Sequence, residues 1–216
     1  MRALAVAKDH TCAAQQLYDW LWPDADGDQA KAACEQALHR LRRLLGSADL
    51  IVQREGKLRL ATDKVWVDLD QWEAAVAGGL RSKDEASGDA VERAFAEFPG
   101  PLLRNEPSAS WFTPAAERVR GSFVELAVRL GMRFEQRGDL VRACDVYQRS
   151  LDAYPTSERV YEALLRVRLA MGDAAGALED YHRCERILAS TLHVKPSPSL
   201  RALVAPLLVS APTTLQ

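Results

Sequence analysis

Apolar residues near the start of the chain recur at the three- and four-residue spacing of a helix. They are Leu17, Tyr18, Leu21 and Trp22. This spacing predicts a helix over 13–22, and Pro23 ends it because proline cannot continue a helix. A longer helix is predicted over 29–45, where Gly46 ends it and the acidic segment 24–28 caps its start.

A short stretch of alternating apolar and polar residues follows the second helix. The segments 50–53 and 57–60 predict the two strands of a hairpin, and Gly56 lies in the turn between them. The apolar residues of 64–68 predict a third strand. Two helices followed by a twisted hairpin is the element order of a winged helix-turn-helix.

The second half of the chain repeats with a period of 34 residues. The matching pairs are Leu130 and Leu164, Gly138 and Gly172, Asp139 and Asp173, Ala143 and Ala177, Tyr147 and Tyr181, and Arg149 and Arg183. This period is typical of tetratricopeptide repeats, each of which is a pair of helices. In such a pair the Gly takes a positive φ at the turn, the Asp caps the next helix, and the small Ala lets that helix approach its partner. The tyrosines are then core residues, and the alternative is two ordinary amphipathic helix pairs.

Two domains and a tail are predicted from these patterns. Residues 1–70 form the winged helix-turn-helix, residues 71–209 form the helical repeat domain, and residues 210–216 form a flexible tail. The stretch 78–89, rich in Gly, Ser and charge, marks the region of the boundary. Further helices are predicted over 70–80, over 90–98, from Thr113 to about 137, and from Ser199 onward.

The composition is that of an ordinary water-soluble protein. The 48% hydrophobic and 27% charged residues match globular domains. There is neither a secretory signal nor an apolar run near the roughly 20 residues of a membrane span, so we expect a cytoplasmic protein. The 4 cysteines stand far apart, outside any zinc-binding spacing, and are expected to be buried thiols on helix faces without a metal.

Several motifs resemble those of a known family of regulators. In the first half they are Leu21-Trp22-Pro23-Asp24, the run from Ala37 to Gly46, and Val65-Trp66-Val67-Asp68. In the second half they are Phe98-Pro99-Gly100-Pro101-Leu102-Leu103, Glu106-Pro107, Trp111, Glu117-Arg118-Val119-Arg120 and Val194-Lys195-Pro196-Ser197-Pro198. The first set is similar to the winged-helix half of OmpR-type and antibiotic-regulatory bacterial transcription factors. The second is similar to the bacterial transcriptional activator domain that follows it. The resemblance implies a regulator of transcription that is mainly α-helical, with a truncated winged helix-turn-helix, a small β-hairpin and a tetratricopeptide-like repeat domain.

The start of the chain departs from this family pattern. Members of the family begin with a small amino-terminal β-sheet and a complete first helix, whereas residues 1–6 are enough only for the end of such a helix. Either the chain is a fragment of a longer regulator, with a sensor or nucleotide-binding region upstream, or its winged helix is reduced.

The second helix of a helix-turn-helix enters the major groove of DNA, where its outward face reads the bases. The inward stripe of the helix over 29–45 is apolar and consists of Cys34, Leu38, Leu41 and Leu45. The outward side then carries Gln36, His39, Arg40 and Arg43. Gln pairs with adenine and Arg with guanine, and His39 suits a base or a phosphate; the family resemblance makes Arg40 the first candidate for a base contact. Phosphate contacts are predicted for Lys31 and Arg42 on the flank and for Arg54 and Lys57 at the hairpin tip.

An alternative explanation of these basic residues stays open. The three arginines of the run occupy the last turns of their helix, where positive charge also complements the helix dipole. Glu35 and the acidic segment 24–28 repel phosphate, and the formal charge is -2, so DNA contact depends on a local patch. The alternative function is a protein-interaction module of a larger signalling protein, with a winged helix that no longer binds DNA.

The repeat half is expected to bind proteins, because stacked hairpins form a curved surface that takes a peptide or a helix. Candidate partner-binding residues are Arg129, Arg133, Arg166 and Arg168, with solvated helix charge as the alternative. The expected partners are duplex DNA, transcription machinery or an upstream sensor domain, and a second copy of the chain. The sequence holds no phosphate loop, nucleophile motif or paired metal-binding histidines, so we expect neither catalysis nor a cofactor.

Overall fold

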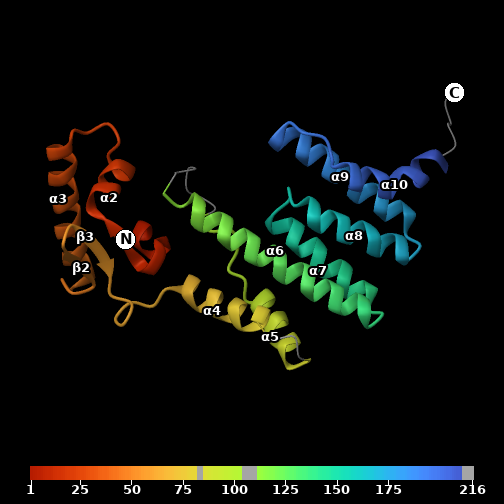
Figure 1. Ribbon diagram of the computed structural model, residues 1–216, viewed down its shortest axis with the longest axis horizontal. Coiled ribbons are helices and arrows are strands. Elements are labelled where there is room, and N and C mark those ends of the chain that lie inside the picture. The colour runs from red at the N-terminus through yellow and green to blue at the C-terminus, as the bar shows by residue number, and fades with distance from the viewer. Residues whose placement is uncertain (82–84, 104–110, 211–216) are drawn as a thin grey trace. The chain divides into compact units, whose positions relative to one another are not determined.

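The computed structural model describes residues 1–81, 85–103 and 111–210, which are mainly helical with one small sheet (Figure 1). Two compact units make up the chain. The first contains Met1–Glu73 and Leu102–Val119, and the second contains Ala74–Pro101 and Arg120–Gln216. We call the first the winged-helix unit and the second the repeat unit.

The winged-helix unit contains the two predicted helices and the predicted hairpin. Its elements are α1 (Arg2–Val6), the short 3-10 helix η1 (Lys8–His10), β1 (Thr11–Ala13), α2 (Ala14–Leu21), α3 (Gly27–Leu45), β2 (Ile51–Arg54), β3 (Lys57–Leu60) and the start of α4 (Asp68–Arg81). The Asp26 carboxylate caps α3 by accepting a hydrogen bond from the Gln29 backbone N–H at 2.8 Å. Gly46 follows α3 with a φ of 71°, a left-handed conformation that favours glycine. The predicted acidic cap and glycine stop are therefore confirmed.

The sheet is antiparallel, and its strands lie in the order β1-β3-β2. The hairpin turn consists of Glu55 and Gly56, whose positive φ values of 49° and 71° match the twist of the flanking strands. The prediction of a third strand over 64–68 is wrong. The third strand is β1, which occupies the free edge of β3, whereas the Val65 backbone N–H is bonded to the Ala61 carbonyl in a turn.

The core of the winged-helix unit is formed by its helices and one face of the sheet. The buried members of this core are Ala3, Leu4, Cys12, Ala14, Leu17, Cys34, Leu38, Ile51, Leu58 and Leu60. Leu41 and Leu45 of α3 pack against this cluster, which confirms the predicted inward stripe of the helix. Because side chains alternate between the two faces of a sheet, the residues between the core positions of β3, such as Arg59, are exposed.

The described part of the repeat unit is helical. Its elements are α5 (Glu85–Ala96), α7 (Leu140–Ala153), α8 (Glu158–Ala170), α9 (Ala174–Leu192), α10 (Pro198–Ser210) and the larger parts of α4 and of α6 (Thr113–Gln136). The helices predicted in this half are confirmed with small shifts in their ends. The stretch 78–89 is more helical than predicted, since α4 extends to Arg81 and α5 begins at Glu85.

The two repeat turns have the same local structure. Gly138 and Gly172 have φ values of 77° and 75°. Asp139 and Asp173 then cap α7 and α9, because their carboxylates accept a hydrogen bond from the backbone N–H three residues further on, at 3.1 and 2.9 Å. The pairs α6–α7 and α8–α9 are therefore two helical hairpins with equivalent turns, as the 34-residue spacing predicted.

Tyr147 occupies space that a glycine leaves open on the preceding helix. Ala143, Tyr147, Ala177 and Tyr181 are all buried, as predicted. A Cβ atom at Gly131 would collide with the Tyr147 ring, so this approach of α7 to α6 depends on glycine. The Tyr147 hydroxyl donates to Glu135 Oε1 at 2.6 Å. Burial, followed by this hydrogen bond to a carboxylate, raises the pKa of Tyr147 far above its usual value.

The repeats differ at one pair of equivalent positions. Phe134 and Val146 in the first repeat correspond to Arg168 and Asp180 in the second. Arg168 donates to Asp180 at 3.2 Å and to Asp173 at 2.6 Å. Asp180 is only 8% exposed. The second repeat thus holds a charged network where the first holds two apolar side chains.

α10 packs against α8 and α9 and buries Leu200 and Val204 completely. This agrees with the prediction that a last helix covers the end of the repeat stack. Of the predicted tail over 210–216, Ser210 is the last residue of α10 and the rest lies outside the described residues, as does the Glu106-Pro107 motif. Across the described ranges, none of the helices is long and apolar enough to cross a membrane.

Candidate nucleic-acid interface

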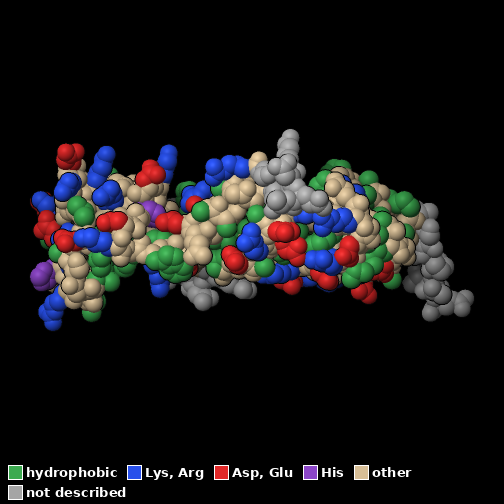
Figure 2. All heavy atoms as spheres, turned by 90° about the horizontal axis from the view of Figure 1, so that it is seen from below, with side chains coloured by type: hydrophobic (Ala, Val, Ile, Leu, Met, Phe, Trp, Pro, Cys, Tyr) green, Lys and Arg blue, Asp and Glu red, His purple; other side chains and the backbone are tan. Residues whose placement is uncertain are grey.

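α3 exposes the polar side that the sequence predicted. Its exposed residues include Lys31, Gln36, His39, Arg40 and Arg43. Cys34 and Leu38 lie on the opposite, buried side of the helix. The outward helix surface therefore presents an amide, an imidazole and two guanidinium groups, while the exposed Lys31 lies on the flank. In the view of Figure 2, Lys and Arg side chains are spread over the winged-helix unit, at the left.

Arg42 has a different environment from the other basic residues of α3. Its guanidinium group donates a hydrogen bond to the Ile51 carbonyl at 2.7 Å, and its Nε atom is buried without a partner among the described residues. The side chain is half-buried rather than exposed. Arg42, predicted to contact phosphate, therefore joins the end of α3 to the first residue of β2, and it fixes the helix against the hairpin.

The hairpin adds three cations on one face of the sheet. Arg54 and Lys57 are exposed partners in the last strand pair before the turn, where the sequence placed them. Arg59 lies two residues beyond Lys57 on β3, and so on the same face. The sequence prediction omitted Arg59, although the alternation of Lys57-Leu58-Arg59-Leu60 contains the signal that identifies it.

The exposed cations of α3 and of the hairpin lack ion pairs within the part of the chain that the structure describes. This holds for Lys31, Arg40, Arg43, Arg54, Lys57 and Arg59. Glu35 is an exposed carboxylate of the same helix and weakens the local field, while the Asp26 carboxylate is bound to the backbone as the α3 cap. Unpaired cations on neighbouring elements attract a polyanion most strongly where they act together.

The arginines of the repeat unit that were predicted to bind a protein partner differ from these cations, because they make contacts within the chain. Arg129 bonds Glu125 at 3.1 Å and the Leu80 carbonyl at 2.8 Å. Arg166 bonds Glu162 at 3.4 Å, and Arg168 belongs to the network described above. The Arg133 guanidinium lies directly over Gly88, where a Cβ atom would collide with it. The structure therefore uses these side chains for contacts inside the unit.

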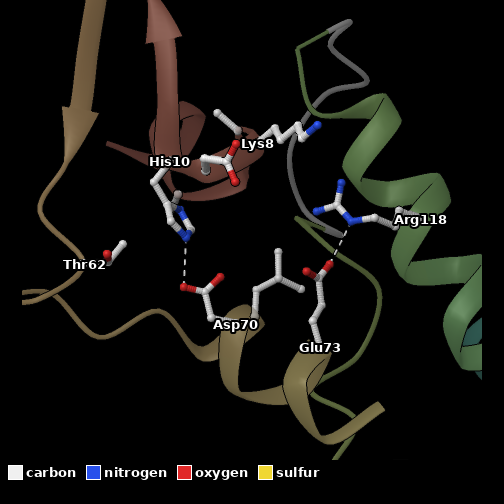
Figure 3. Close-up of a pocket in the computed structure, with 10 residues that line it drawn as sticks. Lys8, His10, Thr62, Asp70, Glu73 and Arg118 are labelled. Carbon is white, nitrogen blue, oxygen red and sulfur yellow. Dashed lines mark hydrogen bonds and ion pairs between the residues drawn. The ribbon is translucent and has the colours of Figure 1, made fainter. Parts of the chain in front are cut away.

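A polar hollow of about 610 Å³ lies beside η1 and the first turns of α4 (Figure 3). His10 Nε2 is 2.9 Å from Asp70 Oδ2, and Arg118 Nε is 2.9 Å from Glu73 Oε1. Asp70 and Glu73 are one helical turn apart on α4. Asp70 pairs with His10, and Glu73 pairs with Arg118. These pairs hold elements together, and no three potential metal ligands cluster anywhere in the described ranges.

The class of protein follows from this architecture. A winged helix-turn-helix joined to helical hairpins, with an unpaired basic surface on the second helix of the motif, is the arrangement of a regulator of transcription. Residues 67–208 match the family described as bacterial transcriptional activator domain, and the chain belongs to this family. The resemblance found in the sequence is confirmed.

Two relatives of the chain are regulatory proteins. Regulatory protein AfsR from Streptomyces coelicolor is 28% identical over 216 residues, which cover 98% of this chain and 22% of AfsR. Transcriptional regulatory protein MoaR1 from Mycobacterium tuberculosis is 25% identical over 226 residues, which cover 97% of this chain and 70% of MoaR1. The chain thus spans about a fifth of the length of AfsR.

A solved structure shares the fold. The structure of Mycobacterium tuberculosis EmbR in complex with a low affinity phosphopeptide matches with a TM-score of 0.65 at 20% identity. The match covers 96% of this chain and 57% of the EmbR chain. It confirms the predicted fold class, with a small sheet and helices followed by helical repeats.

Proposed function

We propose that the chain binds duplex DNA through α3 and the hairpin and thereby acts as the DNA-binding part of a transcriptional regulator. The observation that carries this proposal is the exposed basic side of α3. Its cations have no carboxylate partner within the described ranges, and the same is true of the exposed cations at the hairpin tip. Membership of a family of transcriptional activators supports it.

The residues of α3 and the hairpin have different chemical roles in this proposal. The Gln36 amide suits the paired donor and acceptor of adenine, and the Arg40 and Arg43 guanidinium groups suit guanine. Lys31, Arg54 and Lys57 contact phosphates, which position the protein without reading sequence. Arg42 keeps α3 and β2 in a fixed relation through the bond to the Ile51 carbonyl. The base-reading helix and the hairpin therefore approach the duplex as one rigid piece.

The repeat half supplies the protein-binding function in this proposal. The domain limits that we propose are 1–70 for the winged helix-turn-helix and 71–209 for the repeat domain. Stacked helical hairpins commonly take a peptide or a helix on their curved face. A partner from the transcription machinery, an attached sensor domain or a second copy of the chain fits this role.

Duplex titration at several salt concentrations tests DNA binding. We expect fluorescently labelled genomic and random duplexes to bind the wild type with an affinity that falls steeply with salt, because bound phosphates release counterions. The double variant Arg40→Ala, Arg43→Ala should lose this binding. The matched control is Arg186→Ala, Arg201→Ala, which removes two exposed helix arginines from the repeat unit and should bind as the wild type does.

Two results would contradict the proposal. If the wild type binds no duplex even at low salt, the winged helix has no DNA function and the chain is a protein-interaction module. If the Arg40→Ala, Arg43→Ala variant binds as tightly as the Arg186→Ala, Arg201→Ala control, α3 is not the reading helix. Circular dichroism of both variants establishes that they are folded to the same extent.

A further inference from the structure

The face of the sheet that is turned away from the core carries a cationic hollow. Arg54, Lys57 and Arg59 line it together with Thr11 and Val52, and its volume is about 390 Å³. The strand register explains this arrangement. Arg59 on the central strand lies directly opposite Thr11 of β1 on one side and opposite Val52 of β2 on the other. Arg59 is thus the middle residue of the surface.

The chemistry of the hollow fits a sugar–phosphate strand. Val52 and the aliphatic stems of the three cations form an apolar floor, and the charged groups stand at its rim. A nucleic-acid backbone has the complementary character, since its phosphates are anionic and its sugars present carbon atoms. Glu55 is the carboxylate among the lining residues, and it lies at the turn beside Gly56 rather than on the strands.

The charges of this face are available to a ligand. Neither Arg54 nor Arg59 has an ion pair among the described residues, whereas Arg142 and Arg183 of the repeat unit bond carboxylates at 2.7 and 3.1 Å. The hollow also adjoins the hairpin tip, which the proposed function places on the duplex. Continuity with that contact favours the same duplex as the occupant over a separate acidic protein.

We infer that the outer face of the three-stranded sheet is a second phosphate-binding surface, on which Arg59 contacts the DNA backbone beyond the hairpin tip. This inference rests on the proposed DNA binding. It predicts that the bound duplex is held over a longer stretch than α3 and the tip cover. It also predicts that Arg59 contributes to affinity without contributing to base preference.

The slope of log affinity against log salt concentration measures this contact. Each phosphate contact contributes about 0.9 to the magnitude of the slope. We expect Arg59→Gln to lower the magnitude of the slope by about 0.9. For a threefold rise in salt, the loss of DNA affinity should then be smaller in Arg59→Gln than in the wild type by a factor of about 2.7. Arg59→Lys keeps the charge and should keep the slope. Arg186→Gln, the same change on α9, is the matched control and should bind as the wild type does.

Neutral linkages in the duplex locate the contact. A single methylphosphonate linkage is placed at each position of each strand in turn. At one position it should lower the DNA affinity of the wild type and leave that of Arg59→Gln unchanged. The ratio of affinities for a preferred and a random duplex should be the same in both proteins. Arg59 is exposed, and equal melting temperatures of wild type and variant establish that the sheet is intact.

Several outcomes overturn the inference and separate it from the proposed function. If the wild type binds and the Arg40→Ala, Arg43→Ala variant does not, but Arg59→Gln keeps the wild-type slope, then α3 binds DNA and the sheet face does not. If Arg59→Gln alters base preference, the residue is not a backbone contact. If its DNA slope is unchanged while binding of a polyglutamate peptide is lost, the face binds an acidic protein. A wild type that binds no duplex overturns both proposals.

Discussion

The charged pair of the second repeat offers a test of what stabilises that repeat. Arg168 and Asp180 can be exchanged for the Phe and Val that stand at the equivalent positions of the first repeat, where both are buried. The exchange replaces a charged network by two apolar side chains. The informative set is Arg168→Phe, Asp180→Val and the double variant, because a double-mutant cycle isolates the interaction between the two positions.

The expected magnitudes follow from burial. Asp180 is 8% exposed and the Arg168 side chain is 22% exposed. Removing one member of a buried ion pair costs about 3–5 kcal/mol, and the remaining exposure of Arg168 places Arg168→Phe at the low end, about 3 kcal/mol. Asp180→Val should cost about 1–2 kcal/mol, since Arg168 keeps its second carboxylate partner, Asp173. The double variant should lie within about 1 kcal/mol of the wild type, because an apolar pair often replaces a buried ion pair without loss.

The loss caused by Arg168→Phe should depend on pH. Burial raises the pKa of Asp180, and Arg168 opposes that rise. Without Arg168 the pKa in the folded state rises further above that of the unfolded chain, so the folded state binds the proton more tightly. The deficit is therefore complete at neutral pH and shrinks as the pH falls through the raised pKa.

Urea unfolding followed by far-ultraviolet circular dichroism measures these differences. All 5 tryptophans lie in the winged-helix unit, so their fluorescence reports that unit separately and should not change. A double variant as unstable as Arg168→Phe would refute the reasoning, because the apolar pair of the first repeat would then not be transferable. Wild-type stability in Arg168→Phe would refute it as well, since Asp180 would not need its partner.

Three further predictions concern local packing. Burial raises the pKa of the Cys184 thiol to about 12, so a thiol reagent at mildly alkaline pH should modify it only after denaturation, and fast labelling of the folded chain would contradict its burial. Gly131→Ala directs a Cβ atom into the Tyr147 ring and should lower the free energy of unfolding by about 1–3 kcal/mol. On the same helix, Gly121→Ala meets no atom within 4 Å and should stabilise by about 1 kcal/mol; equal effects in thermal melts would contradict the steric argument. Arg42→Met removes the charged hydrogen bond to the β2 backbone and should cost about 1.5–3 kcal/mol, with faster amide exchange in the hairpin as the second measurement.

The sequence predicts best where a few adjacent residues determine the local structure. Gly138-Asp139 encodes a left-handed residue followed by a helix cap, and the structure has both. The strand β1 has no comparable signal, because three residues are too few to show alternation and its pairing is with the distant β3. The cysteines show the same limit: all four are buried as predicted, but Cys12 lies on that strand rather than on a helix.

The candidate site divides in the same way. The exposed side of α3 follows from helical spacing alone, and so does the buried stripe of Cys34 and Leu38. The bond from Arg42 to the Ile51 carbonyl joins two elements across a turn, and helical spacing carries no information about the neighbouring strand. Arg168 was likewise predicted to bind a partner, whereas in the structure it bonds the buried Asp180 of the next helix. The sequence alone gives no sign of such a contact between helices.

The exposed cations of α3 and the ion pairs of the repeat unit respond to ionic strength in opposite ways. In the repeat unit, pairs such as Arg142 with Glu92 attract, so screening by salt removes some of their stabilisation. On the winged-helix unit, like charges such as Arg40 and Arg43 repel each other, and small anions relieve that repulsion. Moderate salt therefore relieves the repulsion on α3 while it weakens the ion pairs of the repeat unit. A duplex bound to α3 as proposed would act as a concentrated counterion there, so its binding would be coupled to the folding of the winged-helix unit.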